Sequence, residues 1–232
     1  MEIKQFRYGA DNLGYLVYEG SAAIAIDGGA TDAIIEFLNQ NDLSLTHVLN
    51  THTHPDHTVG NAPLARQTGA KHLDIQTLIK KGGIELAGHP IHVYHTPGHS
   101  ADSIVFHFDH ILVSGDTLFI GKVGRCFTGD PEGFLKSIKQ LMALSPETVI
   151  YPGHDYVEEY MDTAKTVEPD NPHIDTFRKT YDPGHVVSTL ADEFRINPTL
   201  RFNEPAVIET LKARGLPHAT EYDRWASVLS LV

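Results

Sequence analysis

The feature of this 232-residue chain that most restricts its fold is a run of metal-binding residue types, THTHPDHTVGN, at residues 51–61. It places His52, His54, Asp56 and His57 close together. Residues two positions apart in an extended segment point to the same side, so His52 and His54 can reach one metal ion together. Asp56 and His57 follow Pro55, where the chain must turn, and can reach a second position. Four ligands divided between two ions leave both sites incomplete, so the fold must bring further ligands here.

Three more ligand candidates follow apolar strand patterns later in the chain. His99 comes after a Pro-Gly turn in YHTPGHS, and VIYPGHDY repeats that turn at His154. Asp116 in LVSGDTLF follows an apolar run and a glycine. Its carboxylate is suited to bridging two cations, because an anion between them offsets their repulsion. Imidazole and carboxylate groups suit zinc, iron and manganese. The other ten histidines lack this spacing and are expected to be structural or surface residues.

Hydrophobic periodicity predicts strands and helices in both halves of the first 170 residues. NLGYLVYEG and SAAIAIDGG are expected to form a hairpin of strands. TDAIIEFLNQN predicts a helix with Thr31 as its N-cap. DPEGFLKSIKQLMAL predicts a second helix, with Asp130 as its cap and Pro131 in its first turn. Each half contains roughly three strands followed by a helix, which indicates an α/β fold of two similar layers.

The pattern changes near residue 170, at the Pro/Asp-rich segment EPDNPHID. No strand pattern follows it. STLADEF has Thr189 followed three residues later by Asp192, and ATEYDRWASVLSLV repeats this with Thr220 and Asp223, as in a capping box. We therefore expect a catalytic domain over residues 1–171 and a small helical appendage over residues 172–232.

The pattern H-x-H-x-D-H, followed by separate His, Asp and His ligands, resembles the metallo-β-lactamase superfamily over about residues 1–170. The resemblance implies a four-layer αββα sandwich with two metal ions at one edge of its sheets. By position, the implied ligands are His52, His54 and His99 for the first metal, Asp56, His57 and His154 for the second, and Asp116 for both. Asp27 in AIDGGA is similar to an early Asp-Gly turn of the superfamily and is expected to be structural rather than a ligand.

Within the superfamily, the sequence resembles the glyoxalase II family, the hydroxyacylglutathione hydrolases. The segments THTHPDHTVGN, SGDTLF, PGHDY and STLADEFRINPTLR carry this resemblance. It implies that the helical appendage helps to bind the thiol portion of a substrate, together with Arg125, Phe127 and Tyr156. The family's final helix usually supplies an arginine and a lysine to glutathione, whereas those places are expected to hold Ala219 and Tyr222. The sequence therefore leaves the identity of the thiol open.

The resemblance implies a binuclear metal-dependent thioester hydrolase, most like the enzymes that convert S-lactoylglutathione to D-lactate and glutathione. Two divalent ions, zinc or alternatively iron or manganese, would lower the pKa of a shared water toward about 7. Asp56 would orient the resulting hydroxide for attack on the thioester carbonyl. One alternative is a persulfide dioxygenase with one iron, held by the counterparts of His52, His99 and Asp116. The non-enzymatic alternative is a metal-binding sensor or scaffold.

Charge and composition narrow the expected partners. The formal net charge is −12, from 18 basic and 30 acidic residues, so nucleic acids and anionic membranes are not expected to bind. No apolar run approaches the roughly 18–20 residues that cross a bilayer, and no signal-peptide pattern is found. Cys126 is the single cysteine, so no internal disulfide can form, which is typical of the reducing cytoplasm. A small-molecule thioester in the cytoplasm is the expected substrate.

Overall fold

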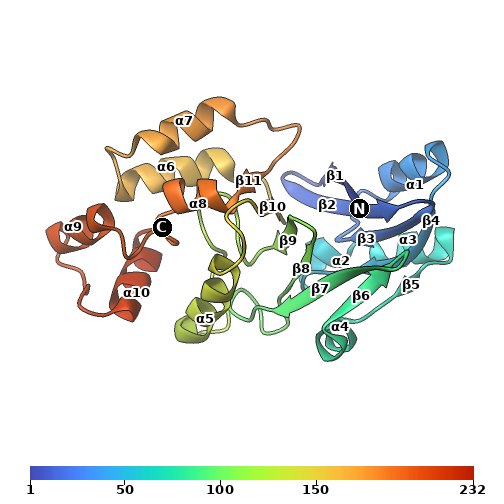
Figure 1. Cartoon of the computed structure of the whole chain (residues 1–232), viewed down its shortest axis with the longest axis horizontal. Coiled ribbons are helices and arrows are strands. Elements are labelled where there is room, and N and C mark those ends of the chain that lie inside the picture. The colour runs from blue at the N-terminus through green and yellow to red at the C-terminus, as the bar shows by residue number, and fades with distance from the viewer.

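Residues 1–232 are described by a computed structural model with two β-sheets that enclose an apolar core. The first sheet has the order β1-β2-β3-β4-β5, in which β1, β2 and β3 are antiparallel and β3, β4 and β5 are parallel (Figure 1). Its strands are β1 (Glu2–Tyr8), β2 (Asn12–Glu19), β3 (Ala22–Ile26), β4 (Ser44–Leu49) and β5 (Lys71–His72).

The second sheet has the order β11-β10-β9-β8-β7-β6. Strands β6 to β9 form an antiparallel meander, β10 runs parallel to β9, and β11 is antiparallel to β10. The strands of this sheet are β6 (Gly83–Leu86), β7 (His89–His95), β8 (Ile104–Phe108), β9 (Ile111–Gly115), β10 (Val149–Pro152) and β11 (Ser188–Thr189).

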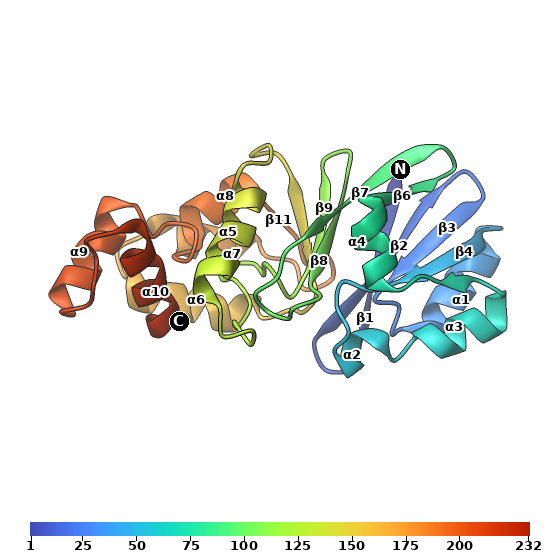
Figure 2. The same ribbon diagram turned by 90° about the horizontal axis from the view of Figure 1, so that it is seen from below.

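Ten helices complete the chain, and several of them cover the outer faces of the sheets. Helices α1 and α3 lie beside the first sheet, whereas α5 and α6 lie on the side of the second (Figure 2). The helices are α1 (Thr31–Gln40), α2 (Pro55–Thr58), α3 (Asn61–Thr68), α4 (Ile75–Lys81), α5 (Pro131–Met142), α6 (Val157–Val167), α7 (Pro172–Thr180), α8 (Leu190–Ile196), α9 (Pro205–Ala213) and α10 (Glu221–Leu231).

Three apolar clusters correspond to the three interfaces between these layers. The cluster between the sheets combines Tyr15 and Ile26 of the first with Phe106 and Val113 of the second. Because side chains alternate along a strand, the neighbouring residue Leu16 faces outward and packs in a second cluster with α1 and α3. A third cluster joins the outer face of the second sheet to α5 and to the C-terminal helices. The arrangement is the predicted four-layer αββα sandwich, which the structure confirms.

Helix caps agree with the sequence at most of the predicted positions. Asp130 accepts a hydrogen bond from Gly133 N at the start of α5. Thr189 and Thr220 form the predicted capping boxes of α8 and α10. The prediction for α1 was wrong, because Thr31 is the first helical residue and the N-cap is Ala30, which has no side-chain hydrogen bond to offer.

The C-terminal region contains helices α7 to α10, with α9 and α10 at the end of the molecule far from the first sheet (Figure 1). The expectation of no strand after residue 170 was wrong at one place. Ser188 and Thr189 form β11, which pairs with Ile150 and Val149 of β10. A two-residue strand is too short to give a periodic signal in the sequence. None of the helices is long and apolar enough to cross a membrane.

Candidate metal centre

The loops that follow β4, β9 and β10 meet at one edge of the sandwich. Backbone hydrogen bonds join the two sheets there, from Ile104 N to Thr51 O at 2.8 Å and from Leu13 N to Gly153 O at 2.8 Å. Within the first loop, Pro55 begins the short helix α2, and His57 N donates to His54 O at 3.1 Å. This turn separates the two pairs of candidate ligands, as the position of the proline predicts.

One group of three imidazoles combines the loop after β4 with the loop after β7. His52 Nε2 lies 3.0 Å from His54 Nδ1, which lies 3.1 Å from His99 Nε2. His52 and His99 are buried, whereas His54 is partly accessible. Their ligand atoms all lie within 4.8 Å of one another, so the three side chains can hold one cation.

A second group combines helix α2 with the loop after β10. His57 Nε2 lies 3.2 Å from His154 Nε2, and Asp56 Oδ2 lies 3.5 Å and 3.3 Å from these two nitrogens. His57 and His154 are buried, and Asp56 is exposed. These three ligand atoms also lie within 4.8 Å of one another and can hold a second cation.

Asp116, in the loop after β9, lies between the two groups. Its Oδ1 is 3.3 Å from His57 Nε2, and its Oδ2 is 3.5 Å from both His99 Nε2 and His154 Nε2. The Oδ1 atom is buried and has no hydrogen-bond partner. Burying a carboxylate oxygen without a hydrogen-bond partner costs free energy. A cation bound between the two groups would offset that cost, which would explain why this oxygen lies among imidazoles.

Most of the imidazoles use their second nitrogen to contact the surrounding protein. His57 Nδ1 lies 2.9 Å from Asp27 Oδ2, and His154 Nδ1 lies 2.8 Å from Asp11 Oδ1. His99 Nδ1 donates to Arg125 O at 3.1 Å. Such contacts fix the ring orientation and leave the other nitrogen free to bind a metal.

The distances between the inward-facing nitrogens fit a metal site. Two imidazoles at about 2.0–2.1 Å from a tetrahedral zinc ion have nitrogens about 3.3 Å apart. The three nitrogen pairs here are separated by 3.0, 3.1 and 3.2 Å. Together with the unpartnered Oδ1 of Asp116, this donor set fits two divalent cations.

Electrostatic effects differ between the two groups when no cation is bound. Burial opposes a charge on His57, yet the negative charges of Asp27 and Asp116 raise its pKa to about 11. Burial and the charge on His57 lower the pKa of His52 to about 4. Burial opposes ionisation of Asp116, but the neighbouring imidazoles of His154 and His57 hold its pKa well below the usual value. The anionic Asp116 thus supplies negative charge where two cations would meet.

Two glycines allow this close packing. A Cβ atom at Gly153 would overlap Asp116 Oδ1 and would lie 2.9 Å from His57 Cε1. A Cβ atom at Gly124 would overlap the backbone oxygen of Asp116. The Pro-Gly-His turn at His154 therefore needs glycine because the ligands approach its backbone.

The residues predicted to contact substrate lie on either side of the cluster. The Phe127 ring is 58% exposed and lies 5.3 Å from His99, while the Arg125 guanidinium lies 5.1 Å from the Phe127 ring. On the other side, the Tyr156 ring stacks on His154, with centroids 5.0 Å apart and planes at 5°. Tyr222 is 40% exposed and lines a depression between α5 and α10 with Lys139 and Glu221.

Sequence reasoning missed two residues that support the cluster. Asn12 Nδ2 donates to Asp56 Oδ2 at 2.9 Å, and Asp11 contacts His154. Asp27, expected to be structural rather than a ligand, contacts His57 Nδ1 directly and is in neither ligand group. Asp11 lies in the turn before β2 and Asn12 begins that strand, and no local pattern connects them with His154, more than 140 positions later. The AIDGGA turn was the sequence signal for Asp27.

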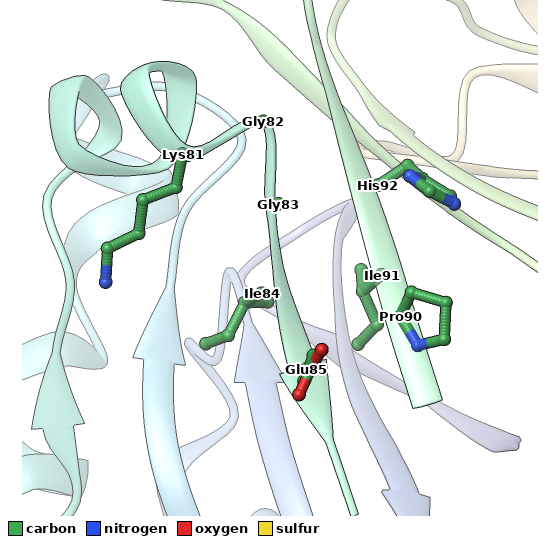
Figure 3. Close-up of a pocket in the computed structure, with 8 residues that line it drawn as sticks. All are labelled: Lys81, Gly82, Gly83, Ile84, Glu85, Pro90, Ile91 and His92. Atoms are coloured by element: carbon green, nitrogen blue, oxygen red, sulfur yellow. The ribbon is translucent and has the colours of Figure 1, made fainter. Parts of the chain in front are cut away.

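A surface depression elsewhere in the molecule contains no comparable group. It lies between the end of α4 and the β6–β7 hairpin, and its lining includes Lys81, Glu85 and His92. These side chains lie apart from one another instead of converging (Figure 3). None of the seven clustered ligand candidates lines it.

Comparisons with known proteins agree on the family. The sequence matches the family described as "Metallo-beta-lactamase superfamily" over residues 11–76 and 73–154. It is 33% identical to the hydroxyacylglutathione hydrolase of Methylobacterium sp. (strain 4-46), covering 89% of each chain. It is 32% identical to the hydroxyacylglutathione hydrolase of Maricaulis maris (strain MCS10), covering 97% of this chain and 95% of that one. The crystal structure of ETHE1 from Myxococcus xanthus has the same fold, with a TM-score of 0.67, 23% identity and coverage of 98% and 100%.

Proposed function

This chain belongs to the metallo-beta-lactamase superfamily and, within it, to the hydroxyacylglutathione hydrolase family, and we propose that it is a binuclear metal-dependent thioester hydrolase. The observation that carries the proposal is the pair of three-ligand groups that meet at Asp116. Two relatives that carry the hydroxyacylglutathione hydrolase name cover 89% and 97% of this chain. Family and donor set together favour a hydrolase that uses two divalent ions.

In this proposal, each group of ligands holds one cation. His52, His54 and His99 would hold the first and Asp56, His57 and His154 would hold the second, with Asp116 lying between the two groups. Zinc suits this set of imidazole and carboxylate ligands, and iron or manganese would also suit it. When bound, the two ions would supply Lewis-acid activation of water and of the thioester carbonyl.

The chain's own residues orient the reactants. Asp56 is exposed, and its Oδ2 is held by Asn12 at 2.9 Å, so the carboxylate can accept a proton from an attacking water and direct that water. Arg125 and Phe127 on one side, and Tyr156 on the other, position the thiol portion of the substrate. We propose a thioester related to S-lactoylglutathione as the substrate.

The test combines metal analysis with a panel of thioesters. The purified protein should contain about two divalent ions per chain and should hydrolyse S-lactoylglutathione. Asp116→Ala should lose both ions and at least 10³-fold in kcat/KM, since removal of a group that stabilises reaction charge costs 10²–10³-fold even when it acts alone. A variant that kept both ions and full turnover would contradict the role of Asp116. Oxygen consumption with glutathione persulfide would instead favour a dioxygenase.

A further inference from the structure

The Asp102 carboxylate joins the two loops that supply the first group of candidate ligands. Its Oδ2 accepts a hydrogen bond from Thr53 Oγ1 at 2.7 Å, and its Oδ1 accepts one from Ser100 Oγ at 2.6 Å. Thr53 stands between two of the three histidines, and Ser100 directly follows the third. One side chain therefore contacts a chain neighbour of all three candidate ligands, although 49 positions separate it from Thr53.

His54 is the member of this group whose ring has the least support from the surrounding protein. Its Nδ1 faces His52 and His99, and no hydrogen bond fixes its Nε2. By contrast, His52 Nδ1 lies 3.1 Å from Thr51 Oγ1, and His99 Nδ1 donates to Arg125 O at 3.1 Å. Contacts of this kind orient a ligand, so the position of His54 depends on the backbone that carries it.

Apart from the contact between the two ligand imidazoles, two hydrogen bonds join the loop after β4 to the loop after β7. One runs from Ile104 N to Thr51 O at 2.8 Å, where the second loop enters β8. The other is the bond from Thr53 to Asp102, which begins at the residue next to His54. It is therefore the bond that can set how far His54 stands from the second loop.

The turn that carries Asp102 is itself held in place. Ser103 Oγ accepts from Ser100 N at 3.1 Å and lies 2.7 Å from Ser100 Oγ, and Ser103 is buried. Burial opposes ionisation of Asp102, but the hydrogen bonds from Ser100 and Thr53 lower its pKa, so the side chain is an anion at neutral pH. Hydrogen bonds to an ionised acceptor are stronger than those between neutral groups.

We propose that Asp102 is a positioning residue for one of the two metal ions, because its hydrogen bonds to Thr53 and Ser100 hold His54 within reach of His99. The inference rests on the proposed binuclear function and adds to it a residue that acts on a single metal site. Asp102 acts through Thr53 and Ser100, and neither of these is a ligand. Its loss should therefore weaken the first site and leave the second unchanged.

The test measures the affinities of both zinc ions by competition against a chelator. Asp102→Ala should lower the affinity of one ion by about 10–100-fold and leave the other unchanged. Asp102→Asn should stay within about threefold of the wild type, because its amide oxygen can accept from Thr53 and its amide nitrogen can donate to Ser100 Oγ. The matched control is Asp74→Ala, which removes an exposed carboxylate that accepts from Thr77 Oγ1 at 2.7 Å and should change neither affinity.

A double-mutant cycle shows whether Asp102 acts through Thr53. Thr53→Val removes the hydroxyl and keeps the shape of the side chain, so it should weaken the same ion. The variant with both Thr53→Val and Asp102→Ala should lose no more than about threefold beyond Asp102→Ala alone. Losses that multiply would overturn the inference. Because Thr53→Val changes the same contact from the other loop, it also tests the inference if Asp102→Ala does not fold.

The other outcomes separate this inference from the proposed function. If the wild type hydrolyses thioesters and Asp102→Ala keeps both affinities, the inference fails while the hydrolase function stands. An equal loss at both ions would show that Asp102 supports the whole edge of the sandwich, and a loss in Asp102→Asn as large as in Asp102→Ala would show that its charge matters instead of its hydrogen bonds. Either result overturns the inference. If the wild type binds two zinc ions but hydrolyses no thioester, the proposed function fails, and a selective loss in Asp102→Ala would still support the inference.

Discussion

The side chain of Asp27 connects the first sheet to the candidate metal centre. It is fully buried, and its Oδ1 accepts from Thr51 N at 2.9 Å while Oδ2 accepts from Thr51 Oγ1 at 2.6 Å. The same Oδ2 lies 2.9 Å from His57 Nδ1. An anionic acceptor at this position keeps the proton of His57 on Nδ1 and leaves Nε2 free for a metal.

We therefore expect Asp27→Asn to weaken metal binding at the group formed by Asp56, His57 and His154. An amide nitrogen facing His57 Nδ1 would require that atom to accept, which moves the ring proton to Nε2 and blocks the ligand. Loss of such a supporting contact typically costs 10–100-fold in metal affinity. Competition against a chelator of known affinity, followed by metal analysis, would measure the change.

The matched control for this substitution is Asp42→Asn. Asp42 has φ 52° and Asp27 has φ 51°, so both positions place an aspartate in the left-handed region. Asp42 is exposed, however, and lies in the turn between α1 and β4. Asn tolerates this backbone conformation well, so neither variant should misfold. Equal metal affinity in the two variants would mean that Asp27 does not orient His57.

Helix α8 connects the C-terminal region to the loop that carries Arg125. Glu193 is fully buried, and it accepts from Gly121 N at 2.9 Å, Asn197 Nδ2 at 2.8 Å and Ser188 Oγ at 2.7 Å. Thr199 Oγ1 also accepts from Val123 N at 3.1 Å. The predicted substrate loop is therefore held by side chains of the helical region, which places α8 behind the site.

The buried Glu193 should make stability depend on pH. Burial raises its pKa from 4.5 to about 7, although its three hydrogen bonds act in the other direction. The folded protein then holds a proton that the unfolded chain has lost, so the free energy of unfolding falls as pH rises from about 4.5 through 7. The full effect above that range is about 3 kcal/mol, at about 1.4 kcal/mol per pKa unit.

Glu193→Gln removes this titration while keeping the shape of the side chain. Its amide oxygen can accept from Gly121 N and Asn197 Nδ2, and its amide group can donate to Ser188 Oγ, which also accepts. Urea unfolding of metal-free protein at pH 5 and pH 8 should show that the variant gains stability over the wild type at pH 8. Glu147→Gln, at an exposed position, serves as the control. A pH-independent difference between the variant and the wild type would contradict the prediction.

How well the sequence predicted helices and strands depended on how far apart along the chain the interacting residues are. The capping boxes at Thr189 and Thr220 are local, because donor and acceptor are three residues apart, and both predictions were confirmed. The N-cap at Thr31 was wrong because the chain leaves the Asp27 turn with Ala30 already at the cap position. Strand β11 was missed because its only evidence is its pairing with β10, about 40 positions earlier.

The whole molecule brings seven ligand candidates together from both of its sheets. Four come from the loop after β4 in the first half, and three come from loops of the second sheet. Their types and spacing were sufficient to predict from the sequence which residues would lie together, and they do lie together, whereas their roles as ligands stay a prediction. Asp11 and Asn12 were not predictable, because Asp11 reaches His154 only through packing of the two halves and Asn12 reaches Asp56 only through packing of segments 44 positions apart.

A metal site built from both halves should stabilise the whole fold. Cations that bind the folded state alone raise the free energy of unfolding by about 2.7 kcal/mol at 100 times their dissociation constant. For a chain of this size, 1 kcal/mol corresponds to about 2–4 °C in Tm, so removing the ions with a chelator should lower Tm by about 5–10 °C. Adding zinc back should restore it. Asp116→Ala should have a lower Tm than the wild type both with chelator and with zinc, because the carboxylate that contacts both groups is missing. A wild-type Tm that is the same with chelator and with zinc would show that the two halves hold this edge together without metal.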